Sequence, residues 1–334
     1  MSKHNITLRD IYMARRRIAS IIRKTPLVSS PSLTEHVGVP VYLKLENLQE
    51  TGTFKIRGVT NKLFSLTGDE KARGIITFST GNHGRAVAYV AKELGINAVV
   101  CISQRVPSYR GDAIKRFGAE LAILGKSQDE VMDRALQLQK KQGLTWIDAF
   151  DDPFIIAGHG TIGLELLEDL PEVDTVVVPL SGGGLISGTA LALKSASSAI
   201  RVIGVSPEVA PAMYRSLKAG HPIEIEEKDS IADALLGGIG MDNQYTFRMV
   251  QEYVDDVILL SDEEIAESMA FALDKHHLIV EGAGAVSIAA LLTQKVREIG
   301  EKVVVVVSGG NVDLPLLLKI AQNRSGRKAK LNIW

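Results

Sequence analysis

A glycine-rich segment after an apolar run is the first place in this sequence that could do chemistry. The run TVVVPL (175–180) leads directly into SGGGLISG (181–188), and a helical pattern follows. Glycines at a strand-to-helix turn let backbone N–H groups approach an anion, and the N-terminus of a helix favours negative charge. Close packing alone could explain one or two of the three consecutive glycines, but not all three with their flanking serines. We therefore expect a phosphate-binding turn at Gly182, Gly183 and Gly184.

Two common phosphate-binding motifs fit this turn poorly. A nucleoside-triphosphate loop needs Gly-Lys followed by Ser or Thr, which this segment lacks. The dinucleotide site of a nicotinamide-dependent oxidoreductase stays open as an alternative, but the spacing here is G-x-G-x-x-x-G. The next strand also ends at Ser206, where an acid that binds ribose would be expected.

Two other junctions combine strand ends with polar side chains. The run GIITFS (74–79) is followed by TGNHG (80–84), which indicates an anion site at a helix start with hydroxyl and amide groups added. His83 could contact a substrate there or serve a structural role. The run KVVVVVS ends at Ser308, and its hydroxyl is expected at the carboxyl edge of the sheet, where α/β proteins bind ligands.

Lys55 follows a glycine turn in TGTFKIRG (51–58), between the apolar Phe54 and Ile56, at an expected helix start. A lysine near a helix N-terminus and other cations can be held partly neutral, so that it serves as an amine nucleophile. By itself, such a lysine would more often be an ordinary surface residue. A phosphate turn, a second anion site and this lysine together indicate a phosphorylated aldehyde cofactor, pyridoxal phosphate, bound as an imine.

Short apolar runs alternate with longer helical patterns along the chain, and these elements must position the four junctions. Several runs are continuously apolar, as expected for parallel strands that are buried on both faces. The alternation predicts an α/β protein with crossover helices. Strands are expected at 41–46, 74–79, 97–103, 120–124, 175–181, 201–206, 255–261 and 302–308.

The composition argues against several classes of protein. The chain has 334 residues, and domains of about 150 residues would make it two domains. Its 38 Lys+Arg and 39 Asp+Glu give a formal net charge of −1, which argues against a nucleic-acid partner. No stretch reaches the ~18 apolar residues of a membrane span. The single cysteine, Cys101, excludes a disulfide framework within the chain and a Cys-cluster metal site, and we expect it in the core of a cytoplasmic protein.

Six runs that include these junctions resemble the pyridoxal-phosphate-dependent threonine/serine dehydratase family, which includes the serine racemases. The resemblance covers nearly the whole chain, in the family's order, and rests on LKLENLQETGTFKIRG, STGNHGRA, AGHGTIGLE, SGGGLISG, VEGAGAVS and SGGNVD. Within the family, LLGGIGMDN (235–243) and the triplet Val205-Ser206-Pro207 are most similar to the hydroxyectoine utilization dehydratases.

The resemblance implies the fold type II of pyridoxal-phosphate enzymes, which is the fold of tryptophan synthase β. Each of two domains would be a largely parallel sheet flanked by helices. The large, cofactor-binding domain would comprise 1–73 and 152–334, and a small inserted domain would comprise 74–151. The cofactor would lie in the cleft between them, and a homodimer is implied as well.

The resemblance also implies roles for individual residues. Lys55 would be the Schiff-base lysine and the catalytic base at Cα, with Phe54 beside the cofactor ring. Asn82 would hydrogen-bond the ring hydroxyl, and Ser308 would meet the pyridine nitrogen. The backbone N–H groups that would hold the phosphate are those of Gly182, Gly183, Gly184 and Leu185. The substrate carboxylate would be held by Ser79, Thr80, Gly81 and His83.

Several positions depart from the family pattern. Thr80 stands where the racemases carry a serine that acts as acid and base opposite the lysine. Thr80 is therefore a second candidate catalytic residue, and its type weakens the racemase interpretation. Ser206 and Ala212 stand at the acidic positions of the racemase metal site, so we expect no metal. His159 and Ala234 replace the usual Gln and Gly, which indicates an altered substrate pocket.

These features predict a pyridoxal-phosphate-dependent ammonia-lyase that dehydrates a β-hydroxy-α-amino acid to a keto acid and ammonia. Threonine, serine or a hydroxyectoine-derived amino acid would be the small-molecule substrate, and neither nucleic acid nor membrane is an expected partner. Racemisation, β-replacement by a second, nucleophilic substrate and a non-catalytic cofactor-binding role stay open beside the oxidoreductase. Because the resemblance ends near residue 322, feedback control by a regulatory domain is not expected.

Overall fold

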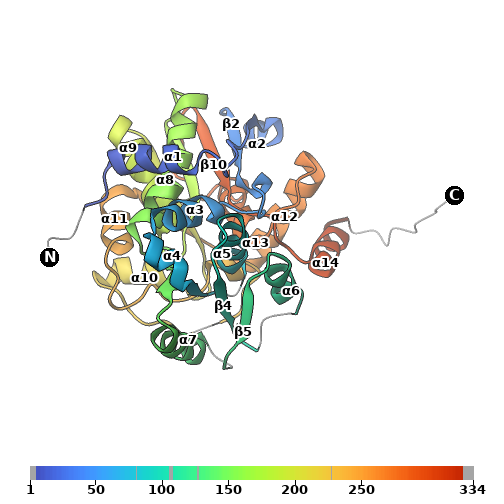
Figure 1. Ribbon diagram of the computed structural model, residues 1–334. Helices are drawn as coiled ribbons and strands as arrows, with labels where there is room; N and C mark the ends of the chain where they lie inside the picture. Colours follow the sequence, from blue (N-terminus) through green and yellow to red (C-terminus); the bar gives the residue numbers. More distant parts are fainter. Residues whose placement is uncertain (1–4, 80, 105–107, 126–127, 227, 326–334) are drawn as a thin grey trace.

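The computed structural model describes residues 5–79, 81–104, 108–125, 128–226 and 228–325, and these residues form two β-sheets (Figure 1). The larger sheet has the strand order β1-β2-β10-β7-β8-β9. Its strands are β1 (Leu27–Ser29), β2 (Val41–Leu45), β7 (Thr175–Pro179), β8 (Arg201–Pro207), β9 (Asp256–Leu260) and β10 (Val303–Val307). β1 is antiparallel to β2, and the other neighbouring strands are parallel.

The smaller sheet is parallel and has the strand order β5-β4-β3-β6. Its strands are β3 (Ile75–Phe78), β4 (Ala98–Ile102), β5 (Glu120–Ile123) and β6 (Thr145–Trp146). In Figure 1, β4 and β5 lie below β2 and β10 of the larger sheet.

Helices connect the strands and cover the faces of both sheets (Figure 1). The first half of the chain contributes α1 (Leu8–Ile18), α2 (Pro31–Val37), α3 (Lys55–Ser65), α4 (Gly68–Arg73), α5 (Asn82–Glu93), α6 (Ser108–Arg116), α7 (Gln128–Gln142) and α8 (Pro153–Asp169). The second half contributes α9 (Gly184–Ala196), α10 (Ala212–Ala219), α11 (Thr246–Tyr253), α12 (Asp262–His276), α13 (Gly282–Leu292) and α14 (Leu314–Ser325). Two short 3₁₀ helices, η1 (Glu46–Leu48) and η2 (Asp233–Leu235), complete the elements.

The five valines of β10 are fully buried because both faces of the larger sheet are covered. Successive side chains in a strand point to opposite faces. Val303, Val305 and Val307 accordingly pack with residues of α12 and α13, whereas Val304 and Val306 pack with residues of α8 and α9. A strand buried in this way places its polar continuation, Ser308 onward, at the carboxyl edge of the sheet.

The smaller sheet repeats this arrangement. Val100 and Ile102 pack with α3 and α5, whereas Val99 and Cys101 face the opposite side and pack with Val131 of α7. The prediction that Cys101 is a core residue is thus confirmed. α3 contributes to the core beneath the smaller sheet, although it follows a strand of the larger one.

The structure confirms the predicted α/β class, the largely parallel sheets and all eight predicted strands. β1 and β6 were not predicted, because strands of three and two residues carry no recognisable pattern. The strands of the smaller sheet lie within 75–146, inside the expected insertion at 74–151. That division into domains stays a prediction. Within the described residues, no helix combines the length and apolar character that crossing a bilayer requires.

Candidate active site

Lys55 is the first residue of α3, as the sequence predicted. The preceding turn is attached to the end of β10, because the Phe54 N–H donates to the carbonyl oxygen of Ser308 at 3.0 Å. Lys55 Nζ donates to the carbonyl oxygen of Ala149 at 2.7 Å. Burial lowers the pKa of Lys55 to about 8, against the opposing attraction of Asp148. A substantial fraction of this amine is therefore neutral in mildly alkaline solution.

Lys55 lines a cavity of about 860 Å³ that strand residues of both sheets border, among them Phe78 of β3 and Pro179 of β7. The volume is in the range of small-molecule sites, about 300–1,000 Å³. Every predicted site residue that the structure describes lines this cavity: Phe54, Lys55, Ser79, Gly81, Asn82, His83, Gly182, Gly183, Gly184, Leu185 and Ser308. The remaining one, Thr80, lies outside the described residues.

The three consecutive glycines differ in what they do. Gly183 is the N-cap of α9 and has a φ of +90°, a conformation that L side chains rarely adopt. A Cβ on Gly182 would lie 2.5 Å from the Phe150 ring, and one on Gly184 would lie 2.8 Å from the Phe150 carbonyl oxygen. Close packing therefore accounts for two of the glycines, and backbone conformation accounts for the third. The three glycines lie at the N-terminus of α9 and line the cavity. The first N–H groups of a helix have no hydrogen-bond partners within it, so those of α9 lie beside the cavity.

Asn82 begins α5 and is held by two other side chains. Its Nδ2 donates to Glu281 Oε1 at 2.8 Å, and its Oδ1 accepts from Asn311 Nδ2 at 2.8 Å. Asn311 Oδ1 in turn accepts from Arg85 Nη1 at 2.9 Å. The amide of Asn82 is thereby fixed in orientation on the wall of the cavity.

Glu281 is a buried carboxyl group in this wall that the sequence motifs did not single out. Burial raises its pKa to about 7, with a further contribution from Asp233. It lies in the quoted run VEGAGAVS, immediately before α13, and an acid before a glycine-rich helix start was the available signal. Ala149 was also missed, because its contact with Lys55 uses a backbone carbonyl that carries no residue-type signal.

Ser79 and His83 line the cavity but already have partners in the protein. Ser79 Oγ accepts from the N–H groups of Gly81 and Gly84 at 3.1 and 2.8 Å, which holds the start of α5. His83 is 4% exposed, with Nε2 located 3.4 Å from the carbonyl oxygen of Ile147. Burial, with a smaller effect of Lys55, lowers the pKa of His83 to about 3, so the imidazole is neutral.

His159 lies behind Phe54, on α8, with the two ring centroids 4.8 Å apart in an edge-on arrangement. It is 1% exposed, and Gly58 is needed opposite it, since a Cβ there would lie 2.6 Å from His159 Nε2. Burial, followed by the charge of Lys55, holds the pKa of His159 well below its usual value. The folded protein therefore contains a neutral imidazole at this position.

His159→Gln should flatten the dependence of stability on pH. Below about pH 6.5, the unfolded chain takes up a proton at His159 that the folded chain does not, so the free energy of unfolding falls as the pH falls. Between about pH 7.5 and about pH 5.5, the wild type should lose about 1.4 kcal/mol more than the variant. Urea unfolding at both pH values measures this. The exposed His221, changed to Gln, should leave the wild-type difference unchanged. Parallel losses in wild type and His159→Gln would contradict the neutral imidazole.

The donor groups around the cavity fit pyridoxal phosphate. Lys55 supplies an amine, the start of α9 supplies N–H groups for a phosphate, and Asn82 and Ser308 supply polar groups for the edges of a ring. The left-handed conformation of Gly183 starts α9 beside the cavity, where the N–H groups that follow could face a phosphate. At the first of the two racemase metal positions, the hydroxyl of Ser206 donates to the carbonyl oxygen of Leu180. That we expect no metal there stays a prediction.

Comparison with known proteins gives consistent similarities. Residues 18–309 match the family described as pyridoxal-phosphate dependent enzyme. A Sinorhizobium fredii protein, provisionally named a threonine dehydratase, is 47% identical over 93% of this chain and 94% of its own. The L-threonine ammonia-lyase of Thermotoga maritima is 41% identical over 97% of this chain and 80% of its own. The structure of maize serine racemase superposes with a TM-score of 0.90 at 35% identity, covering 97% of this chain and 99% of that one.

Proposed function

We propose that this chain, which belongs to the family of pyridoxal-phosphate-dependent enzymes, is a lyase that converts a β-hydroxy-α-amino acid to a keto acid and ammonia. The observation that carries the proposal is the position of Lys55. It is an amine of lowered pKa at a helix start, and it lines one cavity with the glycine turn at 182–185 and with Ser308. The relatives named as threonine dehydratase and threonine ammonia-lyase support the same reaction.

Bound pyridoxal phosphate would supply an electron-accepting ring that makes the Cα proton of an attached amino acid acidic. Lys55 would hold the cofactor and then take up the Cα proton, for which a pKa of about 8 is well suited. The β-hydroxyl group would leave as water, and hydrolysis of the released enamine would give the keto acid and ammonia. Ser308 offers the pyridine nitrogen a hydroxyl group rather than a carboxylate. A hydroxyl group, unlike a carboxylate, would not stabilise a proton on that nitrogen, which suits an elimination reaction.

The remaining predicted site residues would bind and orient the cofactor and the substrate. The N–H groups of 182–185 would hold the phosphate, and Phe54 and Asn82 would fix the ring. The start of α5 would hold the substrate carboxylate through Ser79, Thr80, Gly81 and His83. A neutral His83 would border the carboxylate site as an uncharged imidazole and not as a cation.

The substrate class can be tested with a panel of amino acids. L-Threonine, L-serine and a hydroxylated diaminobutyrate should include at least one compound that gives ammonia and keto acid in equal amounts. L-Threonine is the first expectation, from the names of the relatives, and the hydroxyectoine-type substrate is the second, from the run LLGGIGMDN at 235–243. Absence of keto acid with every β-hydroxy amino acid would overturn the proposal.

Racemisation is the second candidate, because the chain superposes closely on a serine racemase. Chiral chromatography of the same reactions separates the two functions. A lyase leaves no accumulating D-amino acid, whereas a racemase forms it without keto acid.

We also propose a cytoplasmic homodimer, as the family resemblance implies. The single buried cysteine, whose pKa burial raises to about 11, suits a reducing compartment.

A further inference from the structure

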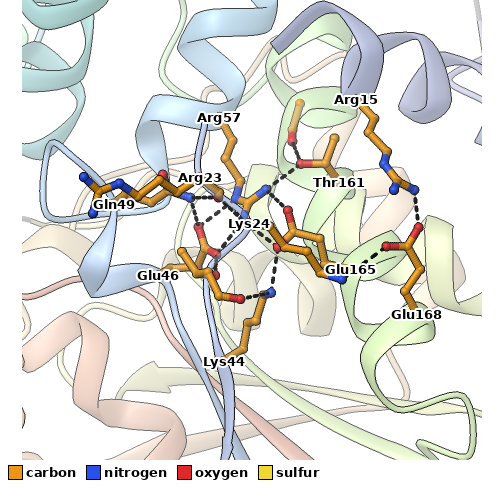
Figure 2. A network of polar contacts seen from close by, with 12 residues as sticks. Arg15, Arg23, Lys24, Lys44, Glu46, Gln49, Arg57, Thr161, Glu165 and Glu168 are labelled. Atoms are coloured by element: carbon orange, nitrogen blue, oxygen red, sulfur yellow. Dashed lines mark hydrogen bonds and ion pairs between the residues drawn. The ribbon is translucent and has the colours of Figure 1, made fainter. Parts of the chain in front are cut away.

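We propose that four buried charged residues, Lys44, Glu46, Arg57 and Glu165, position the catalytic lysine by fixing the rotation of α3. We call these four residues the buried charge network (Figure 2). The inference rests on the proposed function, because it assumes that Lys55 carries the chemistry. It assigns a task to residues outside the cavity, none of which lines it.

Arg57 is the centre of the buried charge network and is held from two sides. Its Nε and Nη2 donate to the two carboxylate oxygens of Glu46 at 2.7 and 2.8 Å. Its Nη1 and Nη2 donate to the two oxygens of Glu165 at 2.6 and 2.8 Å, and Nη1 also reaches Thr161 Oγ1 at 3.1 Å. Figure 2 shows the guanidinium group between the two carboxylates. Two bidentate contacts fix the plane and the direction of this group.

The network joins α3 to β2, to η1 and to α8. Lys44 of β2 is fully buried, and its Nζ lies 2.6 Å from Glu165 Oε2 and donates to the carbonyl oxygen of Thr25 at 2.7 Å. Glu46 follows β2 in η1, and Glu165 belongs to α8. The network therefore ties α3 to β2, the strand beside the edge strand β1 of the larger sheet, and to α8.

The position of Arg57 in the helix links this network to Lys55. Arg57 follows Lys55 by two residues, and side chains two apart on an α-helix point in nearly opposite directions, about 200° apart. Lys55 accordingly points into the cavity while Arg57 points toward β2 and α8. Any rotation of α3 that moved Lys55 along the cavity wall would have to pull the guanidinium group away from both carboxylates.

The packing of α3 on α8 brings the two backbones together next to Arg57. A Cβ on Gly158 of α8 would lie 2.7 Å from the Arg57 carbonyl oxygen and 2.7 Å from Gly58 Cα, so the two backbones touch where they cross. Asn61, further along α3, also donates to the carbonyl oxygen of Phe154 at 2.7 Å. The bidentate contacts of Arg57 add a directional constraint one residue before the crossing, on the side of the helix opposite to Lys55.

The ion pairs of the network are buried, which bears on what they contribute. Burial alone would raise the pKa of Glu46, but attraction to Arg57 outweighs it and keeps this pKa below its usual value. The Glu46 carboxylate is therefore ionised beside the guanidinium group. Buried ion pairs of this kind are often no more stabilising than apolar side chains of the same size. They do restrict orientation, because bidentate contacts tolerate little displacement.

Arg57→Lys tests the inference, since it keeps the charge and removes the fork that grips both carboxylates. Four quantities are measured: the affinity of the cofactor-free protein for pyridoxal phosphate, the pH at which the visible absorbance of the loaded protein titrates, kcat and KM. We expect the affinity for pyridoxal phosphate and kcat to fall about tenfold or more, because Lys55 would be displaced from its productive position. KM for the amino acid should change less than about threefold. The titration should shift by about half a pH unit.

Lys194→Met is the control. Lys194 forms a less buried ion pair with Asp255 at 2.8 Å, near the C-terminal end of α9, and its loss should alter thermal stability alone. If Arg57→Lys does not fold, Glu165→Gln takes its place, because it keeps the shape of the side chain and removes one charge. Its effects should have the same direction.

The inference is overturned if folded Arg57→Lys, or Glu165→Gln in its place, matches Lys194→Met in all four quantities. A Lys55→Ala arm separates this outcome from failure of the proposed function. If Lys55→Ala keeps both the visible absorbance and turnover, the proposed function fails. If it loses both while the network variants match the control, only the positioning role fails.

Discussion

Replacing Lys55 by alanine should abolish turnover and the visible absorbance of the protein loaded with pyridoxal phosphate. The amine is the one side-chain group that we propose both holds the cofactor and takes up the Cα proton. Its loss should lower kcat/KM by about ten-thousandfold or more, the scale on which removal of a nucleophile or catalytic base is felt. Absorbance spectra and keto-acid release measure the two effects separately.

Lys55→Arg separates loss of chemistry from loss of folding. It keeps a cation at the start of α3, but a guanidinium group is not deprotonated in proteins, so this variant should be as inactive as Lys55→Ala. Lys62→Met is the control on the same helix, since Lys62 pairs with Asp152 outside the cavity. It should keep the absorbance and turn over substrate. Turnover by Lys55→Ala or Lys55→Arg would refute the assigned role.

Gly183→Ala should weaken the binding of pyridoxal phosphate by about a hundredfold, because the turn that aims backbone N–H groups at the phosphate would have to shift. Gly183 has a φ of +90°, and a Cβ would lie 3.0 Å from both Met213 Cε and Thr246 Cβ. Pyridoxal, which lacks the phosphate, should bind the variant and the wild type with similar affinity. Fluorescence titration of the cofactor-free proteins with both compounds measures the difference.

Gly220→Ala is the matched control for backbone strain. Gly220 also has a left-handed conformation, with a φ of +78° at the end of α10, and a Cβ there would meet nothing within 4 Å. It should cost about 1 kcal/mol of stability and leave both affinities unchanged. An equal loss of affinity for pyridoxal and pyridoxal phosphate in Gly183→Ala would show that the turn does not bind the phosphate.

Much of the fold could be predicted from the sequence because the strands are buried on both faces. A run such as VVVVV in β10 has no amphipathic alternation, and this absence is itself the signal of a covered parallel strand. β1 gave no such signal, since its three residues are ordered by pairing with β2. The junctions were predictable as well, because the carboxyl ends of parallel strands meet at one edge.

The remainder of the site depends on contacts between residues far apart in the chain. That Phe150 packs on Gly182 and Gly184 could not be read from either segment alone. Lys44 and Arg57 have the residue types of a solvated surface, and only the carboxylates of Glu46 and Glu165 make their burial possible. Glu165 lies 108 positions from Arg57, and a pairing over that separation leaves no local pattern.

Proton NMR of the reaction with L-threonine in heavy water tests the central claim most directly. It follows the signals of the protons on Cα and on the β-carbon in one experiment. A lyase predicts that the threonine signals decay as those of 2-oxobutyrate appear, with ammonia formed in equal amount. Loss of the Cα signal alone, with the other threonine signals retained and no keto acid formed, would contradict the account. Such a spectrum would mean proton exchange or racemisation in place of elimination.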